Sequence, residues 1–593
     1  MRRISNLVLS LGLALTLFSC TNSSDDGRVL NMALGDDIKS MDPAQNYDTV
    51  GNTVTPLINE TLFQYHYLKR PLTLVPHLAE AMPEISKDKK TYTIKIKKGV
   101  LFADDKAFEG GKGRELKAAD FLYGWKRLLL PELASPGTWI FDDGKVAGWD
   151  DYRKKMGDTP AGDREALLQA PVEGLTALDD YTLQIKLLRP YPQLLNVLAM
   201  GFASPMAKEV TAKYGQQGLS QHIVGTGPFM LVDYVAGSKV DLKKNPTYRE
   251  ELYPSDGDAE AIKDGITAAA GQKLPFVDAI HFQIHKQEQP AWLQFLKGRL
   301  DTALIPKDNF DAAILNKELR PELAAKGIKL IKDEEPVIWY LNFNMKDKIV
   351  GGNNKDLRRA ISMAINREEF IEKFRNGRGV VATSMIPRVI AGHTNRTEVV
   401  NGFNVEEAKK TLAKAGYPEG KGLPTLQFDL RGSATSAKQQ AEYIQNSLAA
   451  IGVKMDIIVN TFPAYLRKEQ TGNLQFFLGG WNADYPDAEN FMFLLAGKNA
   501  APGPNASNYV NPVYDKLFEQ ISVMTPSPAR DALIKQAEQV AFDDGIWGML
   551  FYPVEYSIYH SWVKNYRPDS TTSGWIKYLD VDVEAKKAGR AKL

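Results

Sequence analysis

The chain has 593 residues, a formal net charge of +1, 44% apolar residues and a single cysteine. The near-neutral balance of acidic and basic residues argues against a nucleic-acid partner. One cysteine excludes an internal disulfide, so the fold must be stabilised by a buried apolar core, and the length suggests three or four domains.

The beginning of the chain predicts export and a lipid anchor. Two arginines precede a short apolar run over residues 7–18, which is too short to span a bilayer comfortably. A serine then precedes Cys20, as at a bacterial lipoprotein processing site where the cysteine carries the acyl chains. We expect a signal peptide over residues 1–19, then a lipidated Cys20 and a polar tether over residues 20–27. No later run of eighteen apolar residues occurs, so the mature chain should lie in the periplasm or on the extracellular face of the cell envelope.

The N-terminal half contains recognisable strands and a helix. Residues 91–97 and 181–187 alternate polar with apolar side chains, which predicts half-buried strands. Asp120 is placed to cap a helix whose apolar face includes Trp125. Residues 248–277 are polar and acidic with little strand character, so we expect a solvated surface excursion there.

The C-terminal half predicts an α/β lobe. Asn404 is expected to begin a helix, and residues 435–459 show helical apolar spacing followed by strand alternation. A helix around residues 463–469 and a strand over residues 474–478 follow. Helices that alternate with strands indicate an α/β sheet, in which ligands bind beyond the carboxyl ends of strands.

An aromatic and acidic cluster follows this last strand. The stretch "GGWNADYPDAE" places the carboxylates of Asp484, Asp487 and Glu489 beside Trp481 and Tyr485. The spacing lacks the alternation and central glycine of a calcium EF-hand, and nothing else in the chain supports a carboxylate pair for glycoside hydrolysis. Two interpretations stay open. Either Asp484 and the flanking rings bind an organic ammonium group, or the rings are core residues and Asp484 caps the next helix.

The rest of the chain lacks motifs for catalysis, cofactors or metals. It contains neither a Gly-x-Ser-x-Gly elbow nor a Gly-x-x-x-x-Gly-Lys phosphate loop. His281 and His285 are four residues apart, but their segment predicts a strand, in which they would lie about 13 Å from each other. One metal ion could not bind both. We therefore expect no catalytic residue, no cofactor and no metal site.

Eight stretches occur along the chain in an order typical of one family. They are "SMDPAQNYDTVGNTVTPLINETLFQY", "YTIKIKKGVLFADDKAF" with "KAADFLYGWKRLL", "VEGLTALDDYTLQIKLLRPYPQLL", "VGTGPFMLVDYVAGSKVDLKKNPTY", "DLRRAISMAINREEFIEKF", "VEEAKKTLAKAGYP", "WNADYPDAENF" and "NYVNPVYDKLFEQ". Together they resemble the peptide-binding lipoproteins of bacterial ABC importers, which belong to the peptide/nickel class of extracellular solute-binding proteins.

This resemblance implies an α/β, two-lobed periplasmic-binding-protein-like fold (type II) with an extra subdomain and an interlobe ligand cleft. The lobes would close on the ligand by hinge bending. The expected division is lobe I over residues 28–75, 224–305 and 552–593, the extra subdomain over residues 76–223, and lobe II over residues 306–551.

The resemblance also implies a binding protein rather than an enzyme. Such a receptor is a monomer that binds oligopeptides and delivers them to an ABC permease in the inner membrane. The class contains receptors for other solutes, so an oligosaccharide, an opine or a metal chelate is the alternative ligand. A secreted hydrolase that uses the acidic cluster is a further alternative.

The site residues are implied by the same resemblance. In peptide-binding members the acid of a Trp-x-x-Asp pattern pairs with the ligand α-ammonium group, and here that acid is Asp484. Asp487 and Glu489 are then expected to be helix-start or surface charges. Some relatives carry an arginine at the position of Leu478 that meets the carboxylate of shorter peptides, so Leu478 puts such a contact in doubt here. The other residues expected at the site are Gly480, Trp481, Asn482, Tyr485, Phe462 and Tyr552.

Overall fold

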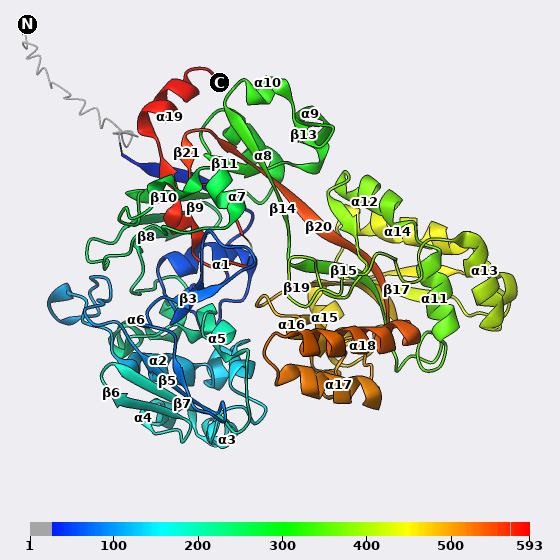
Figure 1. The fold of residues 1–593 in the computed structure, drawn as a ribbon, viewed down its shortest axis with the longest axis horizontal. Coiled ribbons are helices and arrows are strands. Elements are labelled where there is room, and N and C mark those ends of the chain that lie inside the picture. The colour runs from blue at the N-terminus through cyan, green and yellow to red at the C-terminus, as the bar shows by residue number, and fades with distance from the viewer. Residues whose placement is uncertain (1–26, 570) are drawn as a thin grey trace, which may run out of the picture.

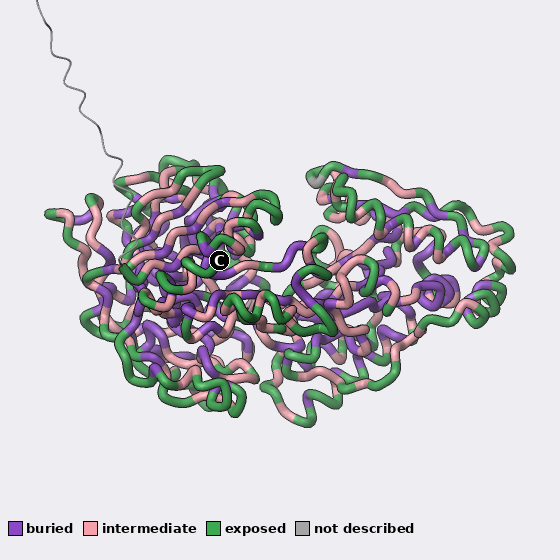
Figure 2. The backbone as a smooth tube through the Cα atoms, turned by 90° about the horizontal axis from the view of Figure 1, so that it is seen from above, coloured by how far each residue is buried: buried purple, intermediate pink, exposed green. Residues whose placement is uncertain are grey.

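The protein consists of two bodies joined by a narrow connection. The computed structural model describes residues 27–569 and 571–593, without the side chain of Phe462. Lobe I and the extra subdomain form the left body in Figure 1 and lobe II forms the right one, and Figure 2 shows the thin junction from above. The predicted signal peptide and Cys20 lie outside the described residues. Within these residues, no helix combines the length and apolarity that a membrane span requires.

Lobe I is built on a four-stranded sheet in the order β1-β10-β9-β8. In this order the strands are Val29–Leu34, Ala279–Ile284, Lys239–Lys244 and Phe229–Val235. β1 runs parallel to β10, and in both strands half-buried residues alternate with buried ones, so one face forms the core of the lobe. β10 confirms the predicted strand around His281.

Short helices and two-stranded ribbons surround this sheet (Figure 1). The helices are α1 (Thr49–Val54), α7 (Ala259–Lys263), α8 (Glu288–Leu296), α9 (Phe310–Ala313), α10 (Pro321–Ala324) and α19 (Val583–Arg590). The ribbons pair β2 (Phe63–Tyr65) with β3 (Leu74–Pro76), β12 (Ile314–Leu315) with β13 (Glu318–Leu319), and β21 (Val563–Lys564) with β22 (Asp580–Val581).

The extra subdomain has its own sheet and its own core. Its strands, in sheet order, are β4 (Glu84–Ile85), β5 (Thr91–Lys95), β7 (Thr182–Lys186) and β6 (Leu175–Asp179). Its helices are α2 (Ala118–Arg127), α3 (Trp149–Asp158), α4 (Arg164–Gln169), α5 (Leu194–Val197) and α6 (Lys208–Gly218). The Phe141 ring makes edge-on contacts with Trp125 and Trp149, with centroids 5.2 Å apart in each pair.

The local predictions for this subdomain are confirmed except at one helix start. β5 and β7 are the two predicted strands. Asp120 is the third residue of α2 and not its cap. Its carboxylate accepts a hydrogen bond from the Lys117 backbone N–H at 2.8 Å, which satisfies a free donor at the helix start from inside the helix.

Lobe II contains a larger mixed sheet in the order β11-β20-β15-β19-β17-β18, with β14 and β16 also paired to β20. In sheet order these strands are Thr302–Leu304, Trp547–His560, Val337–Phe343, Phe476–Asn482, Leu426–Leu430 and Met455–Val459, and β14 is Ile328–Glu334 and β16 Gly379–Val381. Its helices are α11 (Lys355–Met363), α12 (Arg367–Arg375), α13 (Val405–Lys414), α14 (Thr435–Ala449), α15 (Phe462–Gln470), α16 (Glu489–Met492), α17 (Pro512–Ser522) and α18 (Pro528–Asp544).

The helix and strand predictions for lobe II are confirmed. α14 connects the parallel strands β17 and β18, which is the predicted helix–strand unit. Asn404 caps α13, because its side chain accepts a hydrogen bond from the Glu407 N–H. α15 is the helix expected near residues 463–469.

Two long strands connect the lobes and correct the predicted boundary at residue 306. β20 pairs with β15 and β16 in its first half and with β14 and β11 in its second half, so it crosses the junction. Phe310 and Ile314 pack with Trp292 and Ile558 in one apolar cluster on the lobe I side. The chain therefore enters lobe II through β14, some distance after residue 306, because apolar burial holds the intervening helices against lobe I.

The segment over residues 248–277 is more than the solvated excursion that its composition predicts. Tyr253, Leu274 and Phe276 are buried in a small apolar cluster with Tyr67 and Tyr578. The acidic residues lie around this cluster, so the average composition conceals a few residues that anchor the segment to lobe I.

Candidate functional site

β19 carries the aromatic and acidic cluster to the contact between the lobes. The strand runs antiparallel to β15 and extends to Asn482, beyond the predicted end at Leu478. Gly479 and Gly480 permit the close approach of aromatic rings from β15. A Cβ atom at these two positions would lie 2.6 Å from the Tyr340 ring and 2.9 Å from the Trp339 ring. The glycine pair therefore has a packing role.

Asn490 fixes the orientation of Trp481 and Asp484. Its Oδ1 accepts hydrogen bonds from the Trp481 indole N–H at 3.0 Å and from the Asp484 backbone N–H at 2.8 Å. Its Nδ2 donates to Asp484 Oδ2 at 3.1 Å. Asn490 is buried in the first turn of α16. Nothing in the local sequence distinguishes it from an ordinary helix-start residue, and sequence reasoning missed it.

Tyr47 of lobe I contacts the same carboxylate. Its hydroxyl donates to Asp484 Oδ1 at 2.6 Å. Burial raises the pKa of Asp484, and the hydrogen bonds from Tyr47 and Asn490 partly offset this effect. The carboxylate is thus desolvated and oriented, which favours a further charged donor over water. Tyr47 was also missed, because a contact between positions 437 residues apart has no local signal.

The neighbouring acids differ from Asp484. Asp487 is buried, and both of its oxygens accept hydrogen bonds from the Arg530 guanidinium, at 2.6 and 3.0 Å. Of the two predicted roles, helix-start or surface charge, the surface role is wrong, because Asp487 is buried in this ion pair. Its Oδ1 also accepts a hydrogen bond from the Glu489 backbone N–H at 2.8 Å, at the start of α16. Glu489 accepts a hydrogen bond from the Tyr485 hydroxyl at 2.6 Å, and burial raises the pKa of Glu489.

The alternative in which Asp484 caps the next helix is not the observed arrangement. Ala488 occupies the cap position of α16, and the Asp484 side chain bonds instead to Tyr47 and Asn490. Tyr485 is buried against the core of the extra subdomain, with its ring centroid 6.5 Å from that of Trp139. The alternative interpretation is therefore correct in one respect, because Tyr485 is a packing residue.

Three predicted site residues remain: Asn482, Phe462 and Tyr552. Asn482 is exposed at the end of β19. Phe462 begins α15, and its side chain lies outside the described part of the structure. Tyr552 has 0% exposure, and its hydroxyl donates to the Ser384 carbonyl at 2.6 Å. The predicted ligand contact of Tyr552 stays a prediction, and in this structure its hydroxyl finds its partner inside lobe II.

Cavities lie on both sides of Trp481. One, of about 520 Å³, is bounded by Tyr47, Trp481 and Asp484 together with side chains of the extra subdomain. Another, of about 460 Å³, lies inside lobe II along Leu478 and Gly479. Trp481 forms a wall of both cavities, and each is large enough for a small organic ligand.

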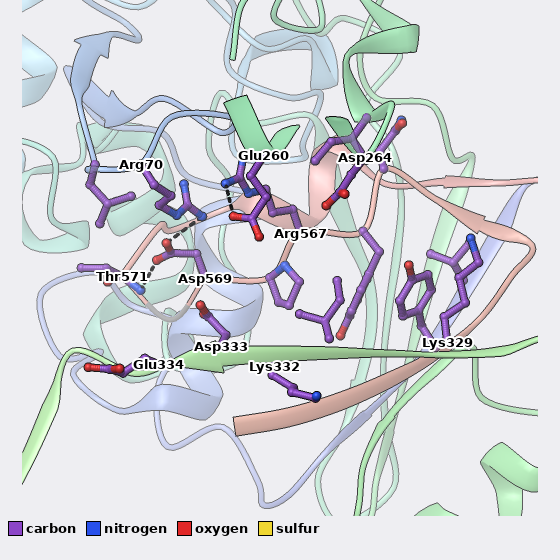
Figure 3. Close-up of a pocket in the computed structure, with 18 of the residues that line it drawn as sticks. Arg70, Glu260, Asp264, Lys329, Lys332, Asp333, Glu334, Arg567, Asp569 and Thr571 are labelled. Carbon is purple, nitrogen blue, oxygen red and sulfur yellow. Dashed lines mark hydrogen bonds and ion pairs between the residues drawn. The ribbon is translucent and has the colours of Figure 1, made fainter. Parts of the chain in front are cut away.

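A larger cavity, of about 1000 Å³, lies along β14 between lobe I and the Arg388 loop of lobe II (Figure 3). Figure 3 shows Arg70 paired with Asp569, at 2.7 Å, above the strand. Burial, together with repulsion from Asp569, raises the pKa of Asp333 to about 7. Charges of both signs line this cavity, which suits a polar ligand better than an apolar one.

Among the described residues, the one group of side chains with metal-binding proximity is Glu60, His77 and Glu251. The Lys577 ammonium donates to Glu251 at 2.8 Å and lies 3.2 Å from His77 Nε2. The Arg249 guanidinium donates to Glu60 at 2.5 Å. Two protein cations thus already neutralise the two carboxylates, so we interpret these five residues, the buried ionic cluster, as structural. His281 bonds to Asp241 in a different place.

The Tyr47–Asp484 contact gives a first prediction. Tyr47→Phe should shift the unliganded protein toward more open conformations, because it removes the one hydroxyl that joins lobe I to this carboxylate. A hydrogen bond to a charged group is worth about 1.5–3 kcal/mol, which is enough to change a two-state population by about tenfold or more. Small-angle X-ray scattering should show a larger radius of gyration for the variant.

Tyr234→Phe is the matched control for this prediction. The Tyr234 hydroxyl donates to the Ile38 carbonyl at 2.9 Å inside lobe I, so its loss should leave the radius unchanged. Equal radii for the Tyr47 variant and the unmodified protein would show that this contact does not hold the lobes together.

Comparison with known proteins identifies the class. Residues 73–503 match the family described as "Bacterial extracellular solute-binding proteins, family 5 Middle". The Dipeptide-binding protein of Escherichia coli K12 is 27% identical over 477 residues, which covers 79% of each chain. The Periplasmic oligopeptide-binding protein OppA of the same strain is 23% identical, over 90% of this chain and 88% of the relative.

A solved structure gives the same result for the fold. The Helicobacter pylori ABC transporter-associated periplasmic binding protein DppA, in complex with the peptide STSA, aligns with a TM-score of 0.71 at 24% identity. The alignment covers 94% of this chain and 99% of the Helicobacter chain. The protein belongs to family 5 of the bacterial extracellular solute-binding proteins, and the expected two-lobed type II fold is confirmed.

Proposed function

We propose that this protein binds oligopeptides between its lobes and delivers them to an ABC permease for import. The observation that carries the proposal is the half-buried, oriented carboxylate of Asp484 at the contact between lobes. The names of the Escherichia coli relatives, a dipeptide-binding and an oligopeptide-binding protein, support this ligand class. On this proposal the protein is a receptor, not an enzyme, and needs no cofactor.

In this proposal the ligand α-ammonium group binds Asp484. An ammonium group supplies charge and three N–H donors, and every unmodified peptide carries one. It compensates the desolvated carboxylate better than the neutral Tyr47 hydroxyl does. Such a charge-assisted hydrogen bond is worth about 1.5–3 kcal/mol net. Trp481, whose indole is fixed by Asn490, forms the wall beside this group.

The edge of β19 is the proposed platform for the peptide backbone. β15 pairs with β19 along its whole length, whereas β17 pairs with it only at Phe476 and Phe477. Among the described strands, residues 479–482 of β19 therefore have a partner on one side only. An extended peptide added to the other side would form main-chain hydrogen bonds that do not depend on its side chains. Binding of varied sequences follows from this arrangement.

The cell-envelope part of the proposal rests on the sequence. We propose that Cys20 carries the lipid and that residues 20–27 tether a monomer to the membrane, in the periplasm or on the extracellular face. The lobes would close by bending at β14 and β20, and the closed pair would present one surface to the permease. With the corrected junction, lobe II in this proposal begins near Pro336.

Native mass spectrometry on protein purified without unfolding tests the proposed ligand class. We expect co-purified masses of mixed-sequence peptides that disappear after the protein is unfolded, dialysed and refolded. A single non-peptide mass would contradict the proposal. Heme is the concrete alternative to look for, because a Haemophilus influenzae relative, 24% identical over 88% of this chain, is named Heme-binding protein A.

A further inference from the structure

The cavity of about 520 Å³ beside Asp484 is also lined by a second set of polar side chains. They come from the extra subdomain: Lys145, Tyr191 and Gln193. The Lys145 ammonium donates to the Trp139 carbonyl at 2.8 Å and lies 4.9 Å from the centre of the Tyr191 ring. The extra subdomain thus contributes hydrogen-bond donors to the same cavity whose other wall carries the acids of lobe II.

Two of these side chains have buried polar atoms without a partner. Tyr191 is 7% exposed and Gln193 is 2% exposed. Neither Tyr191 Oη nor Gln193 Nε2 has a hydrogen-bond partner among the described residues. Buried polar atoms in native proteins are almost always paired, and an unpaired donor is unfavourable. Both atoms belong to side chains that line this cavity, so a polar group that enters it can become their partner.

The cations that line the cavity differ in their partners. Arg189 and Lys498 both pair with Asp143, at 3.0 and 2.8 Å. Lys145 instead contacts the Trp139 carbonyl and the Tyr191 ring. A ligand carboxylate would give the Lys145 ammonium a charged partner.

The protonation state of Lys145 is consistent with a carboxylate partner. Burial lowers the pKa of Lys145 to about 8, so most of the population still carries the charge at neutral pH. Glu489 faces this ammonium, but the Tyr485 hydroxyl already donates to its carboxylate at 2.6 Å. An ammonium group has three donors, and the carbonyl of Trp139 accepts one of them.

We propose that this cavity is a subsite for a ligand carboxylate located close to the ammonium group at Asp484, and that Lys145, Tyr191 and Gln193 bind this carboxylate. Two ligands supply that chemistry: a peptide whose first side chain is acidic, and a very short peptide whose C-terminal carboxylate reaches the cavity. The proposal rests on the proposed function, because it takes Asp484 as the ammonium site. It adds a selectivity that backbone recognition alone does not provide.

Isothermal titration calorimetry with two ligand pairs tests the subsite. Glu-Ala-Ala against Gln-Ala-Ala reports an acidic first side chain, and Ala-Ala against its C-terminal amide reports a terminal carboxylate. We expect at least one carboxylate ligand to bind roughly tenfold or more tightly than its neutral partner, the size of a charge-assisted hydrogen bond. The pair that shows this ratio identifies the source of the carboxylate.

Variants of the extra subdomain complete the test. In Lys145→Met the ratio should fall to near one, while the neutral ligands keep their affinity within about threefold. Tyr191→Phe retains the ring and should reduce the ratio partially, which gives a second readout if the lysine variant folds poorly. Lys154→Met, at an exposed position of α3, is the matched control and should retain the full ratio.

The outcomes separate this inference from the proposed function. The subsite is overturned if peptides bind but both affinity ratios, of the carboxylate ligand to its neutral partner, are near one. It is also overturned if Lys145→Met leaves such a ratio unchanged. In either case the proposed peptide receptor is not contradicted. Absence of binding for all four ligands overturns the subsite, and the peptide receptor is overturned with it only if native mass spectrometry also finds no bound peptide.

Discussion

Replacing Asp484 by alanine is expected to weaken the binding of unmodified peptides by tenfold to a hundredfold. The loss corresponds to one charge-assisted hydrogen bond of about 1.5–3 kcal/mol, at about 1.4 kcal/mol per factor of ten. N-acetylated peptides lack the ammonium group, so their affinity should change by less than about threefold. Titration calorimetry of one peptide in its free and acetylated forms measures both numbers.

Two controls make this result interpretable. Asp484→Asn preserves the shape of the side chain and removes only its charge, so it should reproduce most of the loss for free peptides. Asp456→Ala removes an exposed carboxylate from β18, away from the site, and should change neither affinity. Equal losses for free and acetylated peptides would show that Asp484 does not hold the amino terminus.

The second large effect is expected on stability. Lys577→Met should lower the free energy of unfolding by about 3–5 kcal/mol, because it leaves Glu251 buried without its main cationic partner. Glu251 has a pKa well below its ordinary value, and Lys577 is the largest attractive cause of this depression. The carboxylate is thus ionised in the fold, so its charge cannot easily be removed by protonation. Denaturant unfolding followed by tryptophan fluorescence measures the change.

A surface lysine provides the comparison for this substitution. Lys410 pairs with Glu407 on the exposed face of α13, at 3.6 Å. Exposed pairs of this kind contribute about 0.2–1 kcal/mol, so Lys410→Met should have a small effect. A loss below about 1 kcal/mol for Lys577→Met would mean that the buried ionic cluster relaxes or admits water, and that our structural interpretation of it is wrong.

The buried ionic cluster also explains why the segment over residues 248–277 was misjudged from composition. Arg249 and Glu251 are charged residues in a polar stretch, and such residues are normally solvated. Here their side chains are largely buried, because their partners, Glu60 and Lys577, come from positions far away in the chain. Composition gives the number of charged residues but not which of them form ion pairs.

At the site, too, the local features were predicted and the contacts between distant residues were not. The strand before Trp481 was predicted, and the acid in the Trp-x-x-Asp pattern was singled out by family resemblance. Its two fixed partners, Tyr47 and Asn490, were not identified. Asp487 was expected to be a helix-start or surface charge, and its ion-pair partner, Arg530, was not identified because it lies on another helix. Tyr552 was assigned to the cleft, and in this structure its hydroxyl is satisfied inside lobe II.

The sequence by itself determined the local elements and the class of the protein. Side-chain periodicity and capping act over a few residues, so strands such as β5 and helices such as α13 can be read directly from the chain. Only the tertiary structure decided where lobe II begins, which acid faces the junction and which atoms surround it. These outcomes depend on contacts between segments hundreds of residues apart, because burial and charge compensation are properties of the assembled fold.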